Sequence, residues 1–417
     1  MEELDQNGST PLHESFRREA PLEVQEYLLS KYPSAIGRKD SRGRTALHAA
    51  MCYQKDVPLH LIKMIVEHCP IVVETGDSHD TLPLHFAAWG TSDLDVVQFL
   101  AEKHQEALSR KDTFSGWTPL HSACAPTWSG RSSLEIVKFL VTRQPEMVRE
   151  VDRNGFNPLH LACSEHPACE PNKFSLGVVD YLSRMYPELL KVKSCRGKLP
   201  LHLACEWNAP LGIITTLVER YPDALKVKDE DTGWTPMHHI CEAAACGRDV
   251  KLSTVRVLAE RHPVCDKDDK GRTPFDVMSE ILERSERGKC AIEACMKMSC
   301  ERAPDILEIF RHMSLLNHIA SPNLDKSEVS EALDTMISLK WPQGVTVFFD
   351  FYPLSLCLLP MDDLLMPDIL SVIGRRCSLD TMWEVVRNKS NILGKKGELL
   401  ELLTDSKKKP DYFYLSI

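Results

Sequence analysis

From this sequence we expect neither a secretory signal peptide nor a membrane-spanning segment. Residues 1–5 are acidic and lack an apolar core, so they do not resemble a secretory signal peptide. The most apolar run, residues 345–361, is interrupted by Asp350, Pro353 and Pro360 and is shorter than a membrane-spanning helix requires. We therefore expect this run to be buried core, and we expect no membrane partner.

The usual signatures of enzymes and cofactor sites are also missing. The sequence contains no phosphate-binding Gly-x-x-x-x-Gly-Lys-Ser/Thr, no Gly-x-Gly-x-x-Gly and no Gly-x-Ser-x-Gly. The most metal-like clusters are residues 166–170 and His238–His239 with Cys241, but neither has the paired Cys-x-x-Cys spacing of a zinc site. We interpret both as ordinary helix and loop residues. The sequence thus predicts no enzyme activity, no catalytic residue, no cofactor and no bound metal.

The balance of charge argues against nucleic acid as a partner. The 417 residues include 50 Lys and Arg against 60 Asp and Glu, a net charge of −10. A nucleic-acid-binding surface is normally basic. The chain is also too long for a single compact core, so a multi-domain or repeat architecture is expected.

A four-residue phrase, Thr-Pro-Leu-His, recurs with small changes through the first two-thirds of the chain. Its copies occupy residues 10–13, 45–48, 82–85, 118–121, 157–160, 199–202 and 235–238, with a degenerate eighth at 273–276. Successive copies are 35 to 42 residues apart. A period of this size is typical of a stacked repeat array rather than a single core.

Each repeat has the same local signals in the same order. A turn with glycine comes first, Thr then occupies the N-cap in most copies, and Pro follows at the first helical position. A second helix carries a wide apolar stripe, as in residues 94–100 and 134–140, and a Pro such as Pro222 ends it.

This order of turn, short helix, loop and second helix resembles the ankyrin repeat. The resemblance covers about residues 5–285 and implies an all-α solenoid of helix-turn-helix units with β-turn fingers. It also implies a concave surface of fingers and first helices, which in this family usually binds another protein. We therefore predict an array over residues 1–285. We predict a helical C-terminal region over 286–417, made of degenerate ankyrin-like repeats, a cap and a short tail.

The repeat also explains the histidines and many of the 15 cysteines. One His per repeat, about 10 Å from the next, cannot share a metal ion, so we expect it to hydrogen-bond turn backbone and join neighbouring units. Cysteines in one repeat slot are likewise too far apart for disulfides. They are Cys124, Cys163, Cys205 and Cys241. We interpret them as small buried residues in a reducing compartment, which favours a cytoplasmic or nuclear location.

Candidate partner contacts come from two positions of the repeat. The resemblance implies that the position after the finger glycine faces solvent and touches the partner; it holds Ser9, Arg44, Trp117, Phe156, Lys198, Trp234 and Arg272. Aromatic and Arg residues are the commonest interface anchors. The alternative is that Trp117 and Trp234 only pack on an adjacent finger. Tyr53, Trp89 and Trp207 follow the first helices and would line the same face, or else pack under the loops.

Taken together, these features predict a monomeric, non-enzymatic protein that binds another protein of acidic or mixed surface. An alternative makes it a substrate adaptor of a ubiquitin ligase, with the C-terminal helices docking on the ligase scaffold. In that region residues 365–370 resemble the start of an F-box, but this short match fits a degenerate ankyrin-like repeat equally well. A third hypothesis places an enzyme active site in residues 286–417.

Overall fold

A computed structural model describes residues 5–54, 57–90, 93–125, 134–164, 174–246, 248, 250–259, 261–262, 266–274, 276–278 and 280–281. Contacts divide the chain into one unit of residues 1–254 and 267–271 and a second of residues 255–266 and 272–417. The predicted region 286–417 lies outside the described residues, as do residues 126–133 and 165–173, which hold most of the two longest loops. The predicted boundary at residue 285 therefore stays a prediction. None of the described helices is long and apolar enough to span a membrane.

The described part of the chain is built from pairs of short helices and contains no strand. The first helices of the pairs are α1 (Pro11–Arg17), α3 (Ala46–Tyr53), α5 (Pro83–Gly90), α7 (Pro119–Cys124), α9 (Pro158–Ala162), α11 (Pro200–Glu206) and α13 (Pro236–Ala245). The second helices are α2 (Leu22–Lys31), α4 (Leu59–His68), α6 (Leu94–Lys103), α8 (Leu134–Arg143), α10 (Leu176–Met185), α12 (Leu211–Arg220) and α14 (Leu252–Ala259). This arrangement confirms the predicted all-α solenoid.

A short 3-10 turn follows most of the second helices. These turns are η1 (Pro33–Ala35), η2 (Pro70–Val73), η3 (Gln105–Leu108), η4 (Pro145–Arg149), η5 (Pro187–Lys191) and η6 (Pro222–Lys226). All except η3 begin at the proline that the sequence analysis identified as a helix stop. Proline has no backbone N–H, so the preceding helix cannot continue through it.

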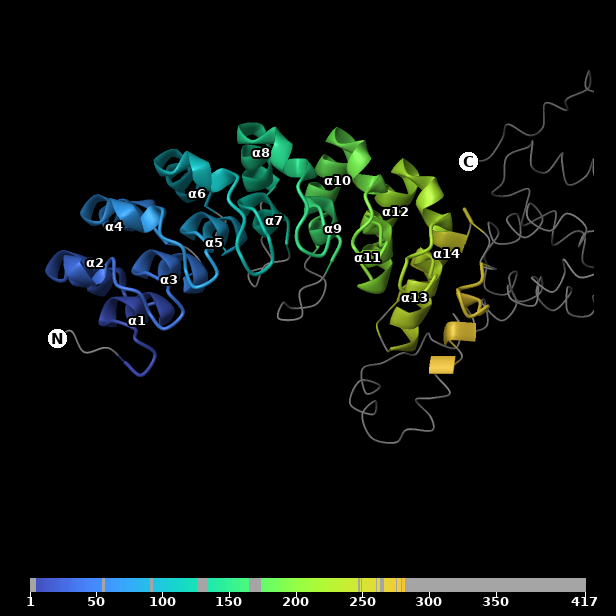
Figure 1. The fold of residues 1–417 in the computed structure, drawn as a ribbon, viewed down its shortest axis with the longest axis horizontal. Coiled ribbons are helices and arrows are strands. Elements are labelled where there is room, and N and C mark those ends of the chain that lie inside the picture. Colours follow the sequence, from blue (N-terminus) through green and yellow to red (C-terminus); the bar gives the residue numbers. More distant parts are fainter. Residues whose placement is uncertain are drawn as a thin grey trace, which may run out of the picture. The chain divides into compact units, whose positions relative to one another are not determined.

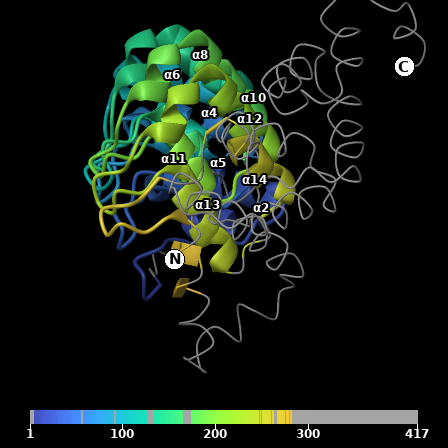
Figure 2. The ribbon, with the colours of Figure 1, turned by 90° about the vertical axis from the view of Figure 1, so that its right-hand side faces the viewer.

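The helix pairs of the first unit follow one another in chain order (Figure 1). First helices pack against first helices, as α1 does on α3 and α11 on α13. In the view of Figure 1 the second helices α2, α4, α6, α8, α10 and α12 form the upper row and the first helices the lower row. Figure 2 shows that the finger turns of successive repeats gather along one side of the stack.

The motif histidine is the third residue of each first helix, and in the first six repeats it also joins that helix to the next repeat. Its Nδ1 accepts the backbone N–H of the N-cap residue, as His48 does from Thr45 at 3.1 Å. With Nδ1 accepting, the neutral ring carries its proton on Nε2. That N–H donates to a carbonyl of the following repeat, at 3.0 Å from His48 to Thr81 and 3.1 Å from His160 to Lys198. The histidines thus have the predicted structural role.

Burial of these rings changes their protonation. All seven motif histidines are at most 2% exposed. Desolvation lowers the pKa of His48, His121 and His160 from 6.5 to about 4, and that of His202 to about 3. The imidazoles are therefore neutral inside the folded array at neutral pH.

The fingers are joined by their own ladder of hydrogen bonds. The N–H of Ser78 donates to Arg42 O at 2.8 Å, and the N–H of Cys195 donates to Asn154 O at 2.8 Å. Within a finger, an aspartate closes the turn: Asp152 Oδ1 accepts the N–H groups of Asn154 and Phe156 at 2.8 Å each. The turn requires a residue with left-handed backbone conformation. Seven fingers have a glycine there, with φ of 70–77°, and the third finger has Asp80, with φ 55°.

The repeated cysteines fill the slot that the sequence analysis assigned to them. Cys124, Cys163, Cys205 and Cys241 are free thiols and at most 3% exposed. Burial raises the pKa of each thiol above its ordinary value, so these groups are unreactive packing residues.

Candidate protein-binding surface

The side chain of Arg44 turns toward the next repeat. Its Nε lies 3.6 Å from Asp77 Oδ2, and its guanidinium carbon is 4.9 Å from the centre of the Phe86 ring. Its Nη1 also donates to the Tyr53 hydroxyl at 3.1 Å. Arg44 is half-buried, so contacts within the array largely compensate its positive charge.

The two finger tryptophans bridge adjacent fingers. The Trp117 indole N–H donates to Asp152 Oδ2 at 3.0 Å, and that of Trp234 donates to Asp268 Oδ2 at 3.2 Å. Trp117 is half-buried, whereas Trp234 is only 8% exposed and stacks on the His238 ring at 6.2 Å. The expectation that this slot faces solvent is therefore wrong for Trp234. The ring fills the space between two fingers, where its N–H finds a carboxylate.

The remaining residues after the glycine also have internal contacts. The Phe156 ring stacks on His160 at 5.5 Å, and Lys198 Nζ lies 2.8 Å from Glu206 Oε2. In the second unit, Arg272 Nη1 lies 2.6 Å from Glu280 Oε2. Phe156, Lys198 and Arg272 are half-buried, and Ser9 is 2% exposed. The expectation that this slot faces solvent is therefore also wrong for Ser9, whereas contact of Phe156, Lys198 and Arg272 with a partner stays a prediction.

The hydrogen bond of Trp117 can be tested by a change that keeps the aromatic ring. We expect Trp117→Phe to lower the free energy of unfolding by about 1–2 kcal/mol, because the charged acceptor on Asp152 loses a donor. Trp207→Phe is the matched control, since that ring contacts the Arg248 guanidinium at 4.7 Å through its face. Urea denaturation of both variants measures the difference. Equal losses would show that the bond between fingers contributes nothing.

Three aromatic side chains lie at the ends of first helices. Tyr53 ends α3, Trp89 is the penultimate residue of α5, and Trp207 is the C-cap of α11. All three are half-buried, so each keeps part of its surface open. The Arg17 guanidinium lies 5.2 Å above the Tyr53 ring, as Arg248 lies over Trp207. We call Tyr53, Trp89 and Trp207 the inner-helix aromatics.

The residues of the metal-like cluster His238–His239 with Cys241 have separate structural roles. His238 is the motif histidine of its repeat, and Cys241 is buried. His239 Nε2 instead lies 2.9 Å from Asp229 Oδ2, with both side chains at most 3% exposed. Burial alone would raise the pKa of Asp229, but hydrogen bonds from His239 and Thr232 bring it below its ordinary value. Residues 166–170, the other such cluster, lie outside the described residues.

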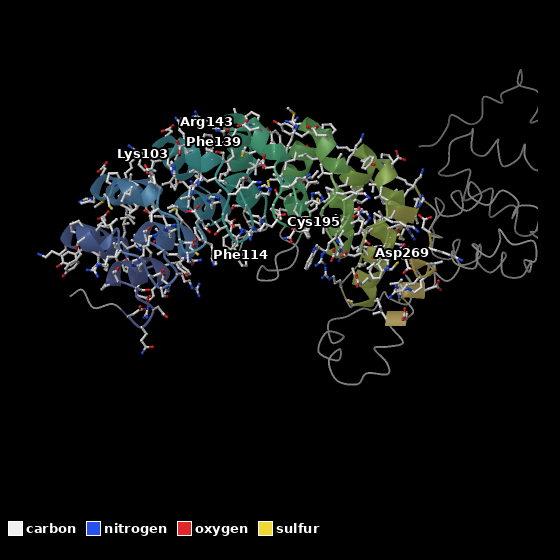
Figure 3. All side chains as sticks on the ribbon, in the orientation of Figure 1. Lys103, Phe114, Phe139, Arg143, Cys195 and Asp269 are labelled. Atoms are coloured by element: carbon white, nitrogen blue, oxygen red, sulfur yellow. The ribbon has the colours of Figure 1, made fainter. Side chains whose placement is uncertain are left out.

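The sequence analysis missed Phe114, which is 69% exposed at the tip of the fourth finger. Figure 3 shows it on a different edge of the first unit from Lys103, Phe139 and Arg143 of the second helices. The available signal was the extra residue between Asp112 and Gly116.

Comparisons with known proteins agree with this architecture. Residues 21–112 and 84–171 each match the family model described as ankyrin repeats in three copies. The chain is 31% identical over 154 residues to the probable 26S proteasome regulatory subunit p28 of Saccharomyces cerevisiae, covering 37% of this chain and 64% of that protein. It is 33% identical over 119 residues to the human transient receptor potential cation channel subfamily A member 1, covering 28% of this chain and 10% of the channel.

Among solved structures, a chain from the complex of the Bd0816 predatory endopeptidase of Bdellovibrio bacteriovorus with immunity protein Bd3460 is similar. Identity is 16% and the TM-score is 0.39, over 51% of this chain and 98% of that chain. Our chain spans less than two-thirds of the length of either curated relative.

Proposed function

Because the chain is an ankyrin-repeat protein, we propose that it binds another protein on the surface formed by its fingers and first helices. Ankyrin repeats generally mediate protein–protein interaction, and stacked repeats create extended binding surfaces. Ankyrin-repeat proteins are also typically non-enzymatic. We propose the same of this chain, with a monomeric state and a cytoplasmic or nuclear location.

The inner-helix aromatics are the observation that carries this proposal. They occupy equivalent ends of three first helices, and their rings are neither fully buried nor fully exposed. An aromatic ring held by contacts within the array adds contact area at little entropic cost when a partner covers it. Arg17 and Arg248 beside two of the rings add the second residue type that is common at interfaces.

The residues after the finger glycine have a different proposed part. Arg44, Trp117 and Lys198 bond to neighbouring residues within the array, and this fixes the orientation of the fingers. We propose that Arg44, Trp117, Phe156 and Lys198 add the rim of the surface through their exposed atoms. Trp234 instead supports the packing of the seventh finger on the eighth.

One relative is named as a subunit of a larger assembly, which supports a protein partner. The alternative of a ubiquitin-ligase adaptor depends on residues 286–417, outside the described residues, and no observation favours it. The enzyme hypothesis depends on the same region.

A paired set of variants tests the proposal. One full-length variant carries Tyr53→Ala, Trp89→Ala and Trp207→Ala; the control carries Tyr27→Ala, Leu176→Ala and Met185→Ala, which are 59%, 48% and 55% exposed on α2 and α10. We expect the wild type and the control to crosslink at least one protein in common. The amount of that protein crosslinked by the first variant should be at least tenfold lower. Thermal melting by circular dichroism checks that both fold. Identical sets of crosslinked proteins would reject this surface. If the triple variant has a lowered melting temperature, the same comparison is made with the three single variants.

A further inference from the structure

Five successive fingertips form a row in which each exposes one basic or aromatic side chain, with Phe114 and Arg153 at different positions of the turn from the other three. The row contains Arg42, His79, Phe114, Arg153 and Arg196, from the second to the sixth finger, and we call it the fingertip row. All five side chains are exposed. Asp40, Asp77, Asp112 and Asp152 are 6–9% exposed and accept backbone N–H groups of their own turns, whereas Asp80, beside His79, is half-buried and its Oδ2 lies 2.6 Å from Arg110 Nη2.

Phe114 is the apolar centre of the row. The neighbouring finger holds it in place, because Thr113 donates both its N–H and its hydroxyl to His79 O, at 2.7 and 2.8 Å. The Phe114 N–H also donates to Asp112 Oδ1 at 2.8 Å. The ring lies tilted against the His79 ring at 5.1 Å and keeps 69% of its surface exposed. A fixed, exposed aromatic ring of this kind marks a contact site.

Guanidinium groups flank this centre on both sides. Arg42 and Arg153 have no ion pair with any described residue. Arg196 Nε lies 3.5 Å from Asp231 Oδ2, on a seventh finger whose tip carries Glu230 and Asp231. The basic stretch therefore ends at the seventh finger. It contrasts with the net charge of −10 of the whole chain.

We propose that the fingertip row binds an extended acidic segment of a partner protein, with an apolar side chain of that segment covering Phe114 and His79. The inference deepens the function proposed above and rests on it. Packed repeats stand about 10 Å apart, so four intervals span roughly 40 Å. An extended chain covers about 3.3 Å per residue, which gives a segment of about 12 residues with acidic side chains on both sides of the apolar one. The acidic seventh finger disfavours a nucleic-acid strand continuing along the array.

The test uses the full-length chain and a random library of 12-residue peptides displayed on phage. We expect the selected peptides to combine several Asp or Glu residues with one central apolar residue. A fluorescein-labelled copy of the most enriched peptide then reports affinity by fluorescence anisotropy. Its affinity should fall at least fivefold when NaCl is raised from 50 to 300 mM, because the exposed guanidinium groups are screened.

Variants identify the contact residues. We expect Phe114→Ser, and separately Arg42→Gln with Arg153→Gln, to weaken the labelled peptide at least tenfold. The matched controls are Tyr27→Ser on α2, which is 59% exposed, and Arg184→Gln on α10, an exposed arginine. Both controls should stay within twofold of the wild type. All substituted side chains are exposed, so we expect every variant to fold.

Each other outcome overturns the inference. The inference is wrong if the selected peptides lack acidic residues. It is also wrong if an acidic peptide binds the Phe114→Ser variant with the affinity that it has for the wild type. If selected peptides instead depend on Trp89 and Trp207, the fingertip row is rejected while the proposed function stands. Failure to select any peptide rejects the row, and the crosslinking experiment then decides the proposed function separately. Binding of a labelled 20-nucleotide oligouridylate that is lost with the arginine variants would identify the row as an RNA contact.

Discussion

Unfolding of the array between about pH 6.5 and pH 4 is the largest effect that we expect. Burial lowers the pKa of His48, His121 and His160 from 6.5 to about 4 and also lowers those of His13 and His85. Since the unfolded chain binds these protons more readily, the stability contributed by neutral imidazoles is fully present above pH 6.5. It is lost as the pH falls toward 4. A pKa near 4 instead of 6.5 corresponds to about 3 kcal/mol per histidine once the pH is below both values.

Urea denaturation from pH 7.5 to pH 4.5 measures this effect. The four rings with a pKa of about 3 to 4, His48, His121, His160 and His202, should together take up about three to four protons on unfolding near pH 5, and the lowered pKa values of His13 and His85 add to this uptake. The variant His121→Gln removes one titrating ring, so its proton uptake should be smaller by about one. A free energy of unfolding that stays constant between pH 7.5 and 5 would contradict the buried, neutral state of these rings.

The second large effect concerns a finger glycine, and we expect Gly155→Ala to destabilise the array by about 3 kcal/mol. Gly155 has φ 74°, and a Cβ at this position would lie 2.6 Å from the Cys195 backbone nitrogen. That nitrogen is already hydrogen-bonded to Asn154 O at 2.8 Å, so it cannot move without breaking the ladder between fingers. The left-handed backbone adds about 1 kcal/mol for a residue with a side chain.

Gly271→Ala is the matched control for this change. Its φ of 77° imposes the same backbone cost, but no atom of the described residues lies within 4 Å of the added Cβ. We therefore expect Gly271→Ala to cost only about 1 kcal/mol. Thermal melting of the two variants separates the steric term from the backbone term. Equal losses in both would mean that contact between fingers does not limit the turn.

Local signals predicted most of the fold because each acts within a few residues. Pro119 and Pro236 begin α7 and α13 as expected, and Pro222 ends the helix before it. The slot of Cys163 and Cys205 was recognised as buried because it recurs at a fixed distance after the motif histidine. A cap, a helix stop or a periodic apolar slot needs no knowledge of distant residues.

The sequence by itself determined the repeat, its helices and the tying role of its histidines, since a signal that recurs every 35 to 42 residues reports one local structure many times over. Only the tertiary structure decided which finger residues reach solvent. Trp234 is covered because Asp268, 34 residues further along, accepts its indole N–H, while Phe114 stays open on the His79 ring of the preceding finger. Exposure at a fingertip depends on the neighbouring repeat. That neighbour is distant in sequence and differs from copy to copy.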